Sequence, residues 1–249
     1  MSEKTVLAMW SGPRNISTAM MRAFENRADT AVWDEPFYAH YLATTGLDHP
    51  MHEAVIDAGE TDAQAVVAAC LAVPARPNRH GSIPRFWFQK HMTVHMQPSI
   101  PLDWTADARN FFLIRRPEAV LASYHDRRAD PGADDVGFAR QAELFDRIAQ
   151  IQGSAPPVID SDTVLAAPEA TLRALCSALG ISFDPAMLAW PPGPREDDGV
   201  WAAHWYASVE TSAGFGPPRP PRPLPDHLVP LAEACRPHYE TLAAHALIP

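Results

Sequence analysis

The strongest constraint on this chain is a set of five short apolar segments separated by stretches of helical character. The segments are Thr5–Trp10, Thr30–Trp33, Arg85–Phe88, Asn110–Ile114 and Pro157–Ile159. They show little polar–apolar alternation and are rich in Val, Ile, Phe and Trp, which is typical of parallel strands covered on both faces. The alternation of strand and helix predicts one α/β domain whose central parallel sheet has about five strands flanked by helices.

Helices are predicted between and after these segments, at Ser17–Asn26, Asp62–Val73, Glu118–Arg128, Phe138–Gln152 and Pro168–Leu179. Gly180 follows the last of them as a C-cap residue. The proline-rich tract 216–225 predicts an extended linker that ties a final helix, at about 226–244, to the body. We expect residues 1–249 to form a single domain.

The composition argues against several classes of protein. The chain has 30 acidic and 20 basic residues, a net charge of −10, and so lacks the basic footprint of a nucleic-acid-binding protein. No apolar run approaches the roughly 20 residues of a membrane helix, and no signal-peptide pattern opens the sequence. Cys70, Cys176 and Cys235 lack metal-ligand spacing and fit reduced thiols. We expect a cytoplasmic protein without nucleic-acid binding or membrane insertion, and the sequence is compatible with a homodimer.

A turn of small and polar residues follows the first strand and leads into a helix. It consists of Gly12, Pro13, Arg14, Asn15, Ile16, Ser17 and Thr18. Such a turn directs free backbone N–H groups and the positive end of the helix dipole at one point, which suits an anion. Ser17 and Thr18 would also suit simple helix capping. Capping does not require a cation, however, so Arg14 favours an anion site. The Gly-Lys-Ser/Thr ending of a Walker A loop is absent.

A second basic turn follows the fourth strand. Arg115 and Arg116 stand at the strand end, and Ser123 lies about two helical turns further on. Arginine and a hydroxyl so placed predict a second phosphate site. Taken alone the pattern is weak, because arginines at strand ends are often merely solvated.

Taken together, the two turns resemble the cofactor loops of sulfotransferases that use 3′-phosphoadenosine 5′-phosphosulfate. The first family loop reads approximately Pro-Lys/Arg-Ser-Gly-Thr-Thr and corresponds to Pro13–Thr18. The second reads Arg-x-Pro followed by a helical serine, as Arg115, Pro117 and Ser123 do.

The resemblance continues through 158–162 and 168–180 to the segment 199–205, which is similar to the family's late Gly-x-Trp segment. Two positions depart from the family pattern. Ile16 replaces the loop glycine, and the late Arg-Lys-Gly triplet is missing, with Arg195 as the candidate substitute.

This resemblance implies a three-layer P-loop-like fold and transfer of a sulfuryl group to a hydroxyl or amine of a small-molecule acceptor. Arg14 and the loop amides would hold the 5′-phosphosulfate of the donor, and Arg115 and Ser123 its 3′-phosphate. The late residues Arg195, Gly199 and Trp201 would lie near that 3′-phosphate. Because a sulfuryl group carries less charge than a phosphoryl group, we expect no metal requirement.

Two sets of residues are candidates for the general base. Several sulfotransferase branches place a base at the end of the second strand, where this chain has Glu35, our first choice. After the third strand come Lys90, His91 and His95, where the cytosolic branch carries Lys-x-His. Lys90 would neutralise the leaving oxygen, and either histidine is an alternative base.

Four aromatic residues are candidates for the wall of an acceptor pocket, although core packing explains aromatic residues equally well. They are Phe37, Tyr38, Tyr41 and Trp205.

Two other functions stay open at this point. Val32–Glu35 has the form of a Walker B segment, in which Asp34 would hold Mg²⁺ for a kinase or nucleotidase. Against that stand the missing Walker lysine and the second anion site. Alternatively the chain is a catalytically degenerate module that interacts through its proline-rich tail. Ile16 favours this interpretation, and the retained Arg14, Arg115 and Ser123 argue against it.

Overall fold

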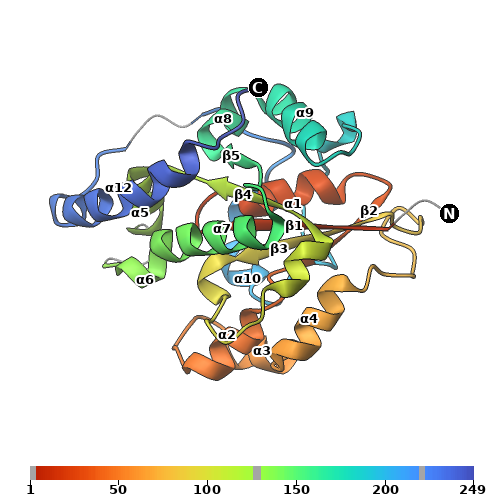
Figure 1. Cartoon of the computed structure of the whole chain (residues 1–249), viewed down its shortest axis with the longest axis horizontal. Helices are drawn as coiled ribbons and strands as arrows, with labels where there is room; N and C mark the ends of the chain where they lie inside the picture. The colour runs from red at the N-terminus through yellow and green to blue at the C-terminus, as the bar shows by residue number, and fades with distance from the viewer. Residues whose placement is uncertain (1–3, 126–129, 219–221) are drawn as a thin grey trace.

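The computed structural model describes residues 4–125, 130–218 and 222–249. Five strands form one sheet in the order β2-β3-β1-β4-β5, and every neighbouring pair is parallel (Figure 1). The strands are β1 (Thr5–Ser11), β2 (Thr30–Asp34), β3 (Phe86–Met92), β4 (Ala108–Ile114) and β5 (Val158–Asp160). The predicted parallel five-stranded sheet is confirmed.

Strand β3 differs most from its prediction, because it continues four residues beyond Phe88. The prediction ended the strand where polar residues begin, but Gln89, Lys90 and His91 are all buried. The Gln89 side chain donates a hydrogen bond to the Cys70 carbonyl at 2.5 Å, so protein groups replace water as its partners. Lys90 therefore lies within the strand and not beyond its end.

Helices cover both faces of the sheet, which gives the predicted three layers. One face packs against α1 (Ser17–Glu25), α8 (Ser161–Ala166) and α9 (Pro168–Ala178). The other packs against α4 (Ala63–Leu71), α7 (Phe138–Gln152) and α12 (Val229–Ala243). Phe24 and Leu175 are buried on the first face, and Phe145 and Leu242 on the second.

The remaining helices are short and lie mostly in connections. The α-helices are α2 (Tyr38–Thr45), α3 (His52–Ala58), α5 (Pro117–His125), α6 (Ala133–Val136), α10 (Ala202–Trp205) and α11 (Ala207–Glu210). The 3₁₀ turns are η1 (Thr93–His95), η2 (Asp103–Asp107), η3 (Pro185–Leu188) and η4 (Asp226–Leu228). Helices α2 and α3 follow β2, in a region for which the sequence analysis predicted no helix.

The predicted ends of the chain's later elements agree with the structure where it describes them. Helix α9 ends before Gly180, whose φ of 63° is the left-handed conformation of a C-cap glycine. Residues 126–128 of the helix predicted at Glu118–Arg128 and residues 219–221 of the proline-rich tract lie outside the described residues. Elements η4 and α12 form the predicted last helix. In the part of the chain that the structure describes, no helix is long and apolar enough to cross a membrane.

Candidate active site

A cavity of about 340 Å³ opens beyond the carboxyl ends of β1 to β4, the edge at which doubly wound sheets bind ligands. Its wall includes the turn after β1, the ends of β2 and β3, Arg115 after β4, the last turn of α5 and parts of the segment 205–217. The predicted site residues that line it are Pro13, Arg14, Asn15, Ile16, Ser17, Thr18, Glu35, Lys90, His95, Arg115 and Ser123. Gly12, His91, Arg195, Gly199 and Trp201 are not among the residues that line it.

The two basic turns meet at one end of this cavity, although they are about 100 residues apart in the sequence. Arg14 Nε donates to the Ser123 hydroxyl at 3.0 Å. Arg115 donates to the Arg14 carbonyl at 2.7 Å. We call Arg14, Arg115 and Ser123 the arginine cluster. All three are partly exposed, so the cluster can meet an anion without first displacing core residues.

Side chains from other elements fix the turn after β1 by donating hydrogen bonds to its backbone carbonyls. Ile16 is the N-cap of α1 with φ 59°, and no side chain caps the helix. A left-handed conformation costs an L-residue about 1–2 kcal/mol. The Ser161 hydroxyl fixes the turn by donating to the Asn15 carbonyl at 2.9 Å. Ile16, which replaces the family's glycine, therefore keeps the left-handed backbone that a glycine would adopt. Among the residues that the structure describes, no side chain caps the first-turn amides of α1.

The other end of the cavity is built on Lys90. The parallel register of β2 and β3 pairs Asp34 with Lys90, so both side chains leave the same face of the sheet. Lys90 Nζ donates to Asp34 Oδ1 and Glu35 Oε1, each at 2.7 Å. It also donates to the Tyr206 hydroxyl at 2.5 Å. We call Asp34, Glu35, Lys90 and Tyr206 the lysine cluster.

Burial and charge set the protonation states in this cluster. Burial alone would lower the pKa of Lys90, but the carboxylates of Asp34 and Glu35 outweigh it and raise that pKa well above its usual value. Lys90 is therefore an ammonium. Burial raises the pKa of Glu35 to about 7, against the opposing effect of Lys90. A carboxylate that titrates near neutrality is suited to general-base work.

Glu35 presents its second oxygen to His95. Glu35 Oε2 lies 3.8 Å from His95 Nδ1, and no residue among those described hydrogen-bonds that nitrogen. Burial lowers the pKa of His95 well below its usual value, so the imidazole is neutral. An acceptor group placed to the side of both atoms can lie within hydrogen-bond distance of each. Glu35 also has φ 44°, a strained conformation of the kind that often marks functional positions.

His91 lies apart from the cavity. Strand pairing sets it beside Trp10, on the opposite face of the sheet from Lys90. Its ring stacks on Trp10 with centroids 4.5 Å apart, and burial lowers its pKa to about 3. We do not carry His91 forward as a base. Phe37 belongs to the same buried cluster, which fits the core-packing interpretation.

The other three aromatic candidates line the cavity. Tyr38 and Tyr41 both stack on His95, with centroids 4.3 and 4.9 Å away. Trp205 comes from the late segment. Tyr38 and Tyr41 border the side of the cavity next to Glu35, which is the side expected to receive an acceptor.

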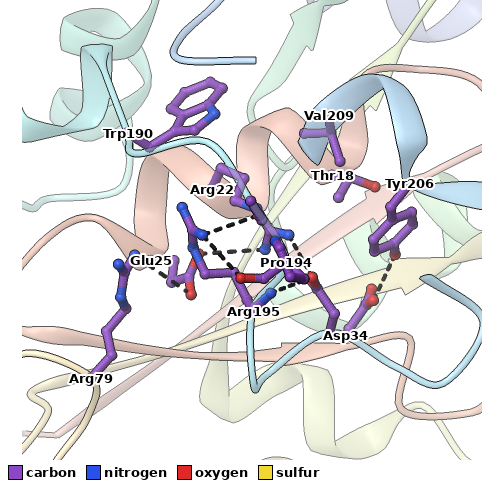
Figure 2. A network of polar contacts seen from close by, with 12 residues as sticks. Thr18, Arg22, Glu25, Asp34, Arg79, Trp190, Pro194, Arg195, Tyr206 and Val209 are labelled. Atoms are coloured by element: carbon purple, nitrogen blue, oxygen red, sulfur yellow. Dashed lines mark hydrogen bonds and ion pairs between the residues drawn. The ribbon is translucent and has the colours of Figure 1, made fainter. Parts of the chain in front are cut away.

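Of the late residues, Arg195 belongs to an ion network with Glu25 on α1 (Figure 2), and Gly199 and Trp201 make hydrogen bonds. Arg195 lies 3.4 Å from Glu25 and donates to neighbouring backbone carbonyls. Gly199 donates its N–H to Asp34 Oδ2 at 3.3 Å, and the Trp201 indole donates to the Tyr206 hydroxyl at 3.2 Å. Gly199 and Trp201 therefore bond to members of the lysine cluster, whereas Arg195 bonds to Glu25 and to backbone carbonyls. None of the three lies in the arginine cluster.

Sequence reasoning missed Tyr206. It stands in an aromatic-rich stretch with no motif, and it is 116 residues from Lys90. Reasoning from the Walker B form gave Asp34 a magnesium-binding role. In the structure Asp34 instead accepts from Lys90 through one oxygen and from Tyr206, at 2.6 Å, through the other. Among the residues that the structure describes, no group of three or more His, Cys, Asp or Glu could hold a metal ion.

Comparison with known proteins gives one family. The family described as "Sulfotransferase domain" matches residues 5–246. A solved structure, the sulfotransferase domain from the curacin biosynthetic pathway, is similar with a TM-score of 0.54 over 100% of both chains at 16% identity. At that identity the likeness concerns the fold, which it assigns to the P-loop-like α/β class.

Two proteins of Arabidopsis thaliana are also similar. Branched-chain-amino-acid aminotransferase-like protein 1 is 35% identical over 98% of this chain and 43% of its own length. Branched-chain-amino-acid aminotransferase-like protein 2 is 34% identical over 96% of this chain and 42% of its own length. The chain thus spans less than half the length of these relatives.

Proposed function

Because this chain belongs to the sulfotransferase domain family of transferases, we propose that it transfers a sulfuryl group from 3′-phosphoadenosine 5′-phosphosulfate to a hydroxyl or amine of a small molecule. One observation carries the proposal. The arginine cluster, which suits an anion, faces the same cavity as the Glu35–Lys90 pair, in which the pKa of Glu35 is about 7. Sulfuryl transfer needs both, since it must hold a charged donor and activate a neutral acceptor.

The arginine cluster is the proposed donor site. The α1 amides and Arg14 would bind the 5′-phosphosulfate, as anions favour helix N-termini. Arg115 and Ser123 would bind the 3′-phosphate. Their contacts with Arg14 support this division, because they keep the two phosphate sites adjacent. Arg195, Gly199 and Trp201 are not included in the donor site.

The lysine cluster is the proposed reaction centre. Glu35 Oε2 takes the acceptor's proton, and the acceptor's electron pair forms a new bond to sulfur. The bond between sulfur and the bridging oxygen breaks, and its electron pair stays on that oxygen, which leaves as part of adenosine 3′,5′-bisphosphate. The Lys90 ammonium stabilises the charge that develops there, and His95 orients the acceptor beside Glu35. No metal is required in this scheme.

A thermal-shift panel tests the donor assignment. The ligands are adenosine 3′,5′-bisphosphate, 3′-phosphoadenosine 5′-phosphosulfate, adenosine 5′-monophosphate as the matched control without a 3′-phosphate, and ATP with and without Mg²⁺. At about 100 times its dissociation constant, a ligand adds about 2.7 kcal/mol of stability, which is about 5–10 °C for a domain of this size.

We expect the two 3′-phosphorylated ligands to give this shift without metal. A shift given only by ATP with Mg²⁺ would favour a kinase instead. No shift with any nucleotide would favour a degenerate interaction module.

A further inference from the structure

We propose that Tyr206 is a positioning residue that fixes the ammonium of Lys90. Glu35 is then the hydrogen-bond partner that Lys90 can release during the reaction. The catalytic role of this contact rests on the proposed function. The contact itself is present in the protein without any ligand. Tyr206 belongs to no motif that the sequence analysis identified, and nothing in the comparisons assigns it a role.

The Tyr206 hydroxyl donates one hydrogen bond and accepts two. Its O–H donates to Asp34 Oδ2 at 2.6 Å, and its oxygen accepts from Lys90 at 2.5 Å. The Trp201 indole N–H donates to the same oxygen at 3.2 Å. Tyr206 stays protonated, because burial and the neighbouring Asp34 carboxylate raise its pKa well above the usual value. The phenol is therefore a neutral bridge between Asp34 and Lys90.

The three shortest hydrogen bonds of Lys90, to Asp34, Glu35 and Tyr206, account for its three N–H groups. The Thr18 hydroxyl on α1 lies further away, at 3.4 Å. Asp34 and Tyr206 also bond each other, so these two acceptors hold each other in place. Glu35 alone among the three becomes neutral during the proposed reaction, when it takes the acceptor's proton. Its hold on Lys90 then weakens, and that N–H becomes available to the leaving oxygen. The other two bonds keep the ammonium from moving away.

The segment that carries Tyr206 is itself anchored by buried ions (Figure 2). Arg22 on α1 donates to Asp198 at 2.6 Å, and the side chains of both residues are almost completely buried. Glu25, also on α1, lies 3.4 Å from Arg195. A buried ion pair of this kind is retained at a desolvation cost, which fits a role in fixing geometry. The network ties the late segment to the helix that begins at the donor site.

Ammonium-selective NMR of ligand-free protein labelled with ¹⁵N-lysine tests the proposal. The chain contains two lysines, Lys4 and Lys90, and Lys4→Met assigns the remaining signal. We expect the buried Lys90 ammonium to exchange slowly with water. Tyr206→Phe keeps the ring and removes one acceptor, so exchange should become about tenfold faster, the equivalent of one lost hydrogen bond.

Tyr239→Phe is the matched control, because Tyr239 also donates to an aspartate, Asp160, at 2.8 Å and does not line the cavity. In the Tyr239→Phe variant, the Lys90 ammonium should exchange at a rate within about twofold of that in the original protein. If Tyr206→Phe does not fold, Trp201→Phe, which removes the indole donor to the Tyr206 oxygen, should speed exchange to a smaller extent.

A Lys90 exchange rate within about twofold of the original protein in a folded Tyr206→Phe variant would overturn the proposal. A purely structural role for Tyr206 would lower the free energy of unfolding without changing the exchange rate. Since no donor or acceptor is present, this outcome is independent of the nucleotide panel that tests the proposed function.

Discussion

The arginine cluster and the lysine cluster border one cavity but are built in opposite ways. In the arginine cluster, partly exposed cations contact a hydroxyl and a backbone carbonyl. In the lysine cluster, one buried cation is enclosed by two carboxylates and a phenol. The first cluster places two cations at a partly exposed surface where a ligand can enter. The second places one ammonium between two carboxylates in the interior.

This difference suits the arginine cluster to binding the donor and the lysine cluster to the chemical step. An open cluster of cations can hold a charged donor with little rearrangement, but water screens it and moderates its effect on reacting atoms. A buried cluster acts strongly on nearby charge, yet its atoms are already paired. Among the described residues, the Glu35–His95 side of the lysine cluster has a buried nitrogen, His95 Nδ1, without a hydrogen-bond partner. We therefore expect substitutions in the two clusters to change different measurements.

The largest effect is expected from Glu35→Gln, which keeps the shape of the side chain and removes its ability to take a proton. Turnover should fall by about 10²–10⁴, the usual contribution of a positioned general base. Affinity for adenosine 3′,5′-bisphosphate should change little. Steady-state kinetics and calorimetry of the same variant measure the two quantities.

Glu143→Gln, on an exposed α7 carboxylate paired with Arg140, is the control and should leave turnover unchanged. His95→Ala should be milder than Glu35→Gln. Near-normal turnover in Glu35→Gln beside an inactive His95→Ala variant would transfer the base role to His95.

Lys90→Met should lower turnover nearly as much as Glu35→Gln does, and it should also lower the free energy of unfolding. It leaves two buried carboxylates without their cation, and breaking a buried ion pair in this way costs about 3–5 kcal/mol. Urea unfolding measures this loss. Lys4→Met removes the chain's other lysine, which is exposed, and should change the free energy of unfolding by less than about 0.5 kcal/mol. Equal effects of the two substitutions would mean that the lysine cluster does not form.

A smaller and more selective effect is expected from Arg115→Ala combined with Ser123→Ala. Each lost bond to a charged phosphate costs about 1.5–3 kcal/mol. Adenosine 3′,5′-bisphosphate should therefore bind at least about tenfold more weakly, while adenosine 5′-monophosphate should bind as before. Arg116→Ala is the control, because this neighbouring arginine is exposed and pairs with Asp162 at 2.7 Å. Equal weakening of both nucleotides would contradict the assignment of the 3′-phosphate.

The smallest effect concerns the left-handed backbone of Ile16. Ile16→Gly and Ile16→Ala both remove the side chain's packing, but only glycine adopts φ 59° without cost. The Ile16→Gly variant should therefore be more stable than the Ile16→Ala variant by about 1 kcal/mol in chemical unfolding. An Ile16→Ala variant of equal or greater stability would show that this turn does not hold the left-handed conformation.

The fold was largely predictable from the sequence, because buried parallel strands leave a local signal. The five apolar segments became β1 to β5, and Pro168 and Gly180 marked the ends of α9. The failure at β3 has a physical cause. Apolar patterns treat polar residues as solvated, whereas Gln89, Lys90 and His91 are buried beside protein partners. Local patterns do not show which polar residues will find such partners.

The same reasoning explains which parts of the site were visible. A helix N-terminus and its adjacent cation are neighbours in the sequence, so Arg14 and its turn stood out. The partners of Lys90 come from β2 and from the late segment, up to 116 residues away, and only the folded chain brings Tyr206 to them. His91 was a natural candidate because it adjoins Lys90, but neighbours in a strand point to opposite faces.

Transfer of label from a ³⁵S-labelled donor tests the central claim most directly. The protein is incubated with ³⁵S-labelled 3′-phosphoadenosine 5′-phosphosulfate, fractions of a small-molecule extract and excess chelator. We predict that label moves to an acceptor without metal. The rate should rise with pH through about 7, because Glu35 must lose its proton before it can take another, and Glu35→Gln should abolish this rise. No transfer of ³⁵S from any fraction, together with Mg²⁺-dependent transfer of ³²P from γ-labelled ATP, would contradict the account.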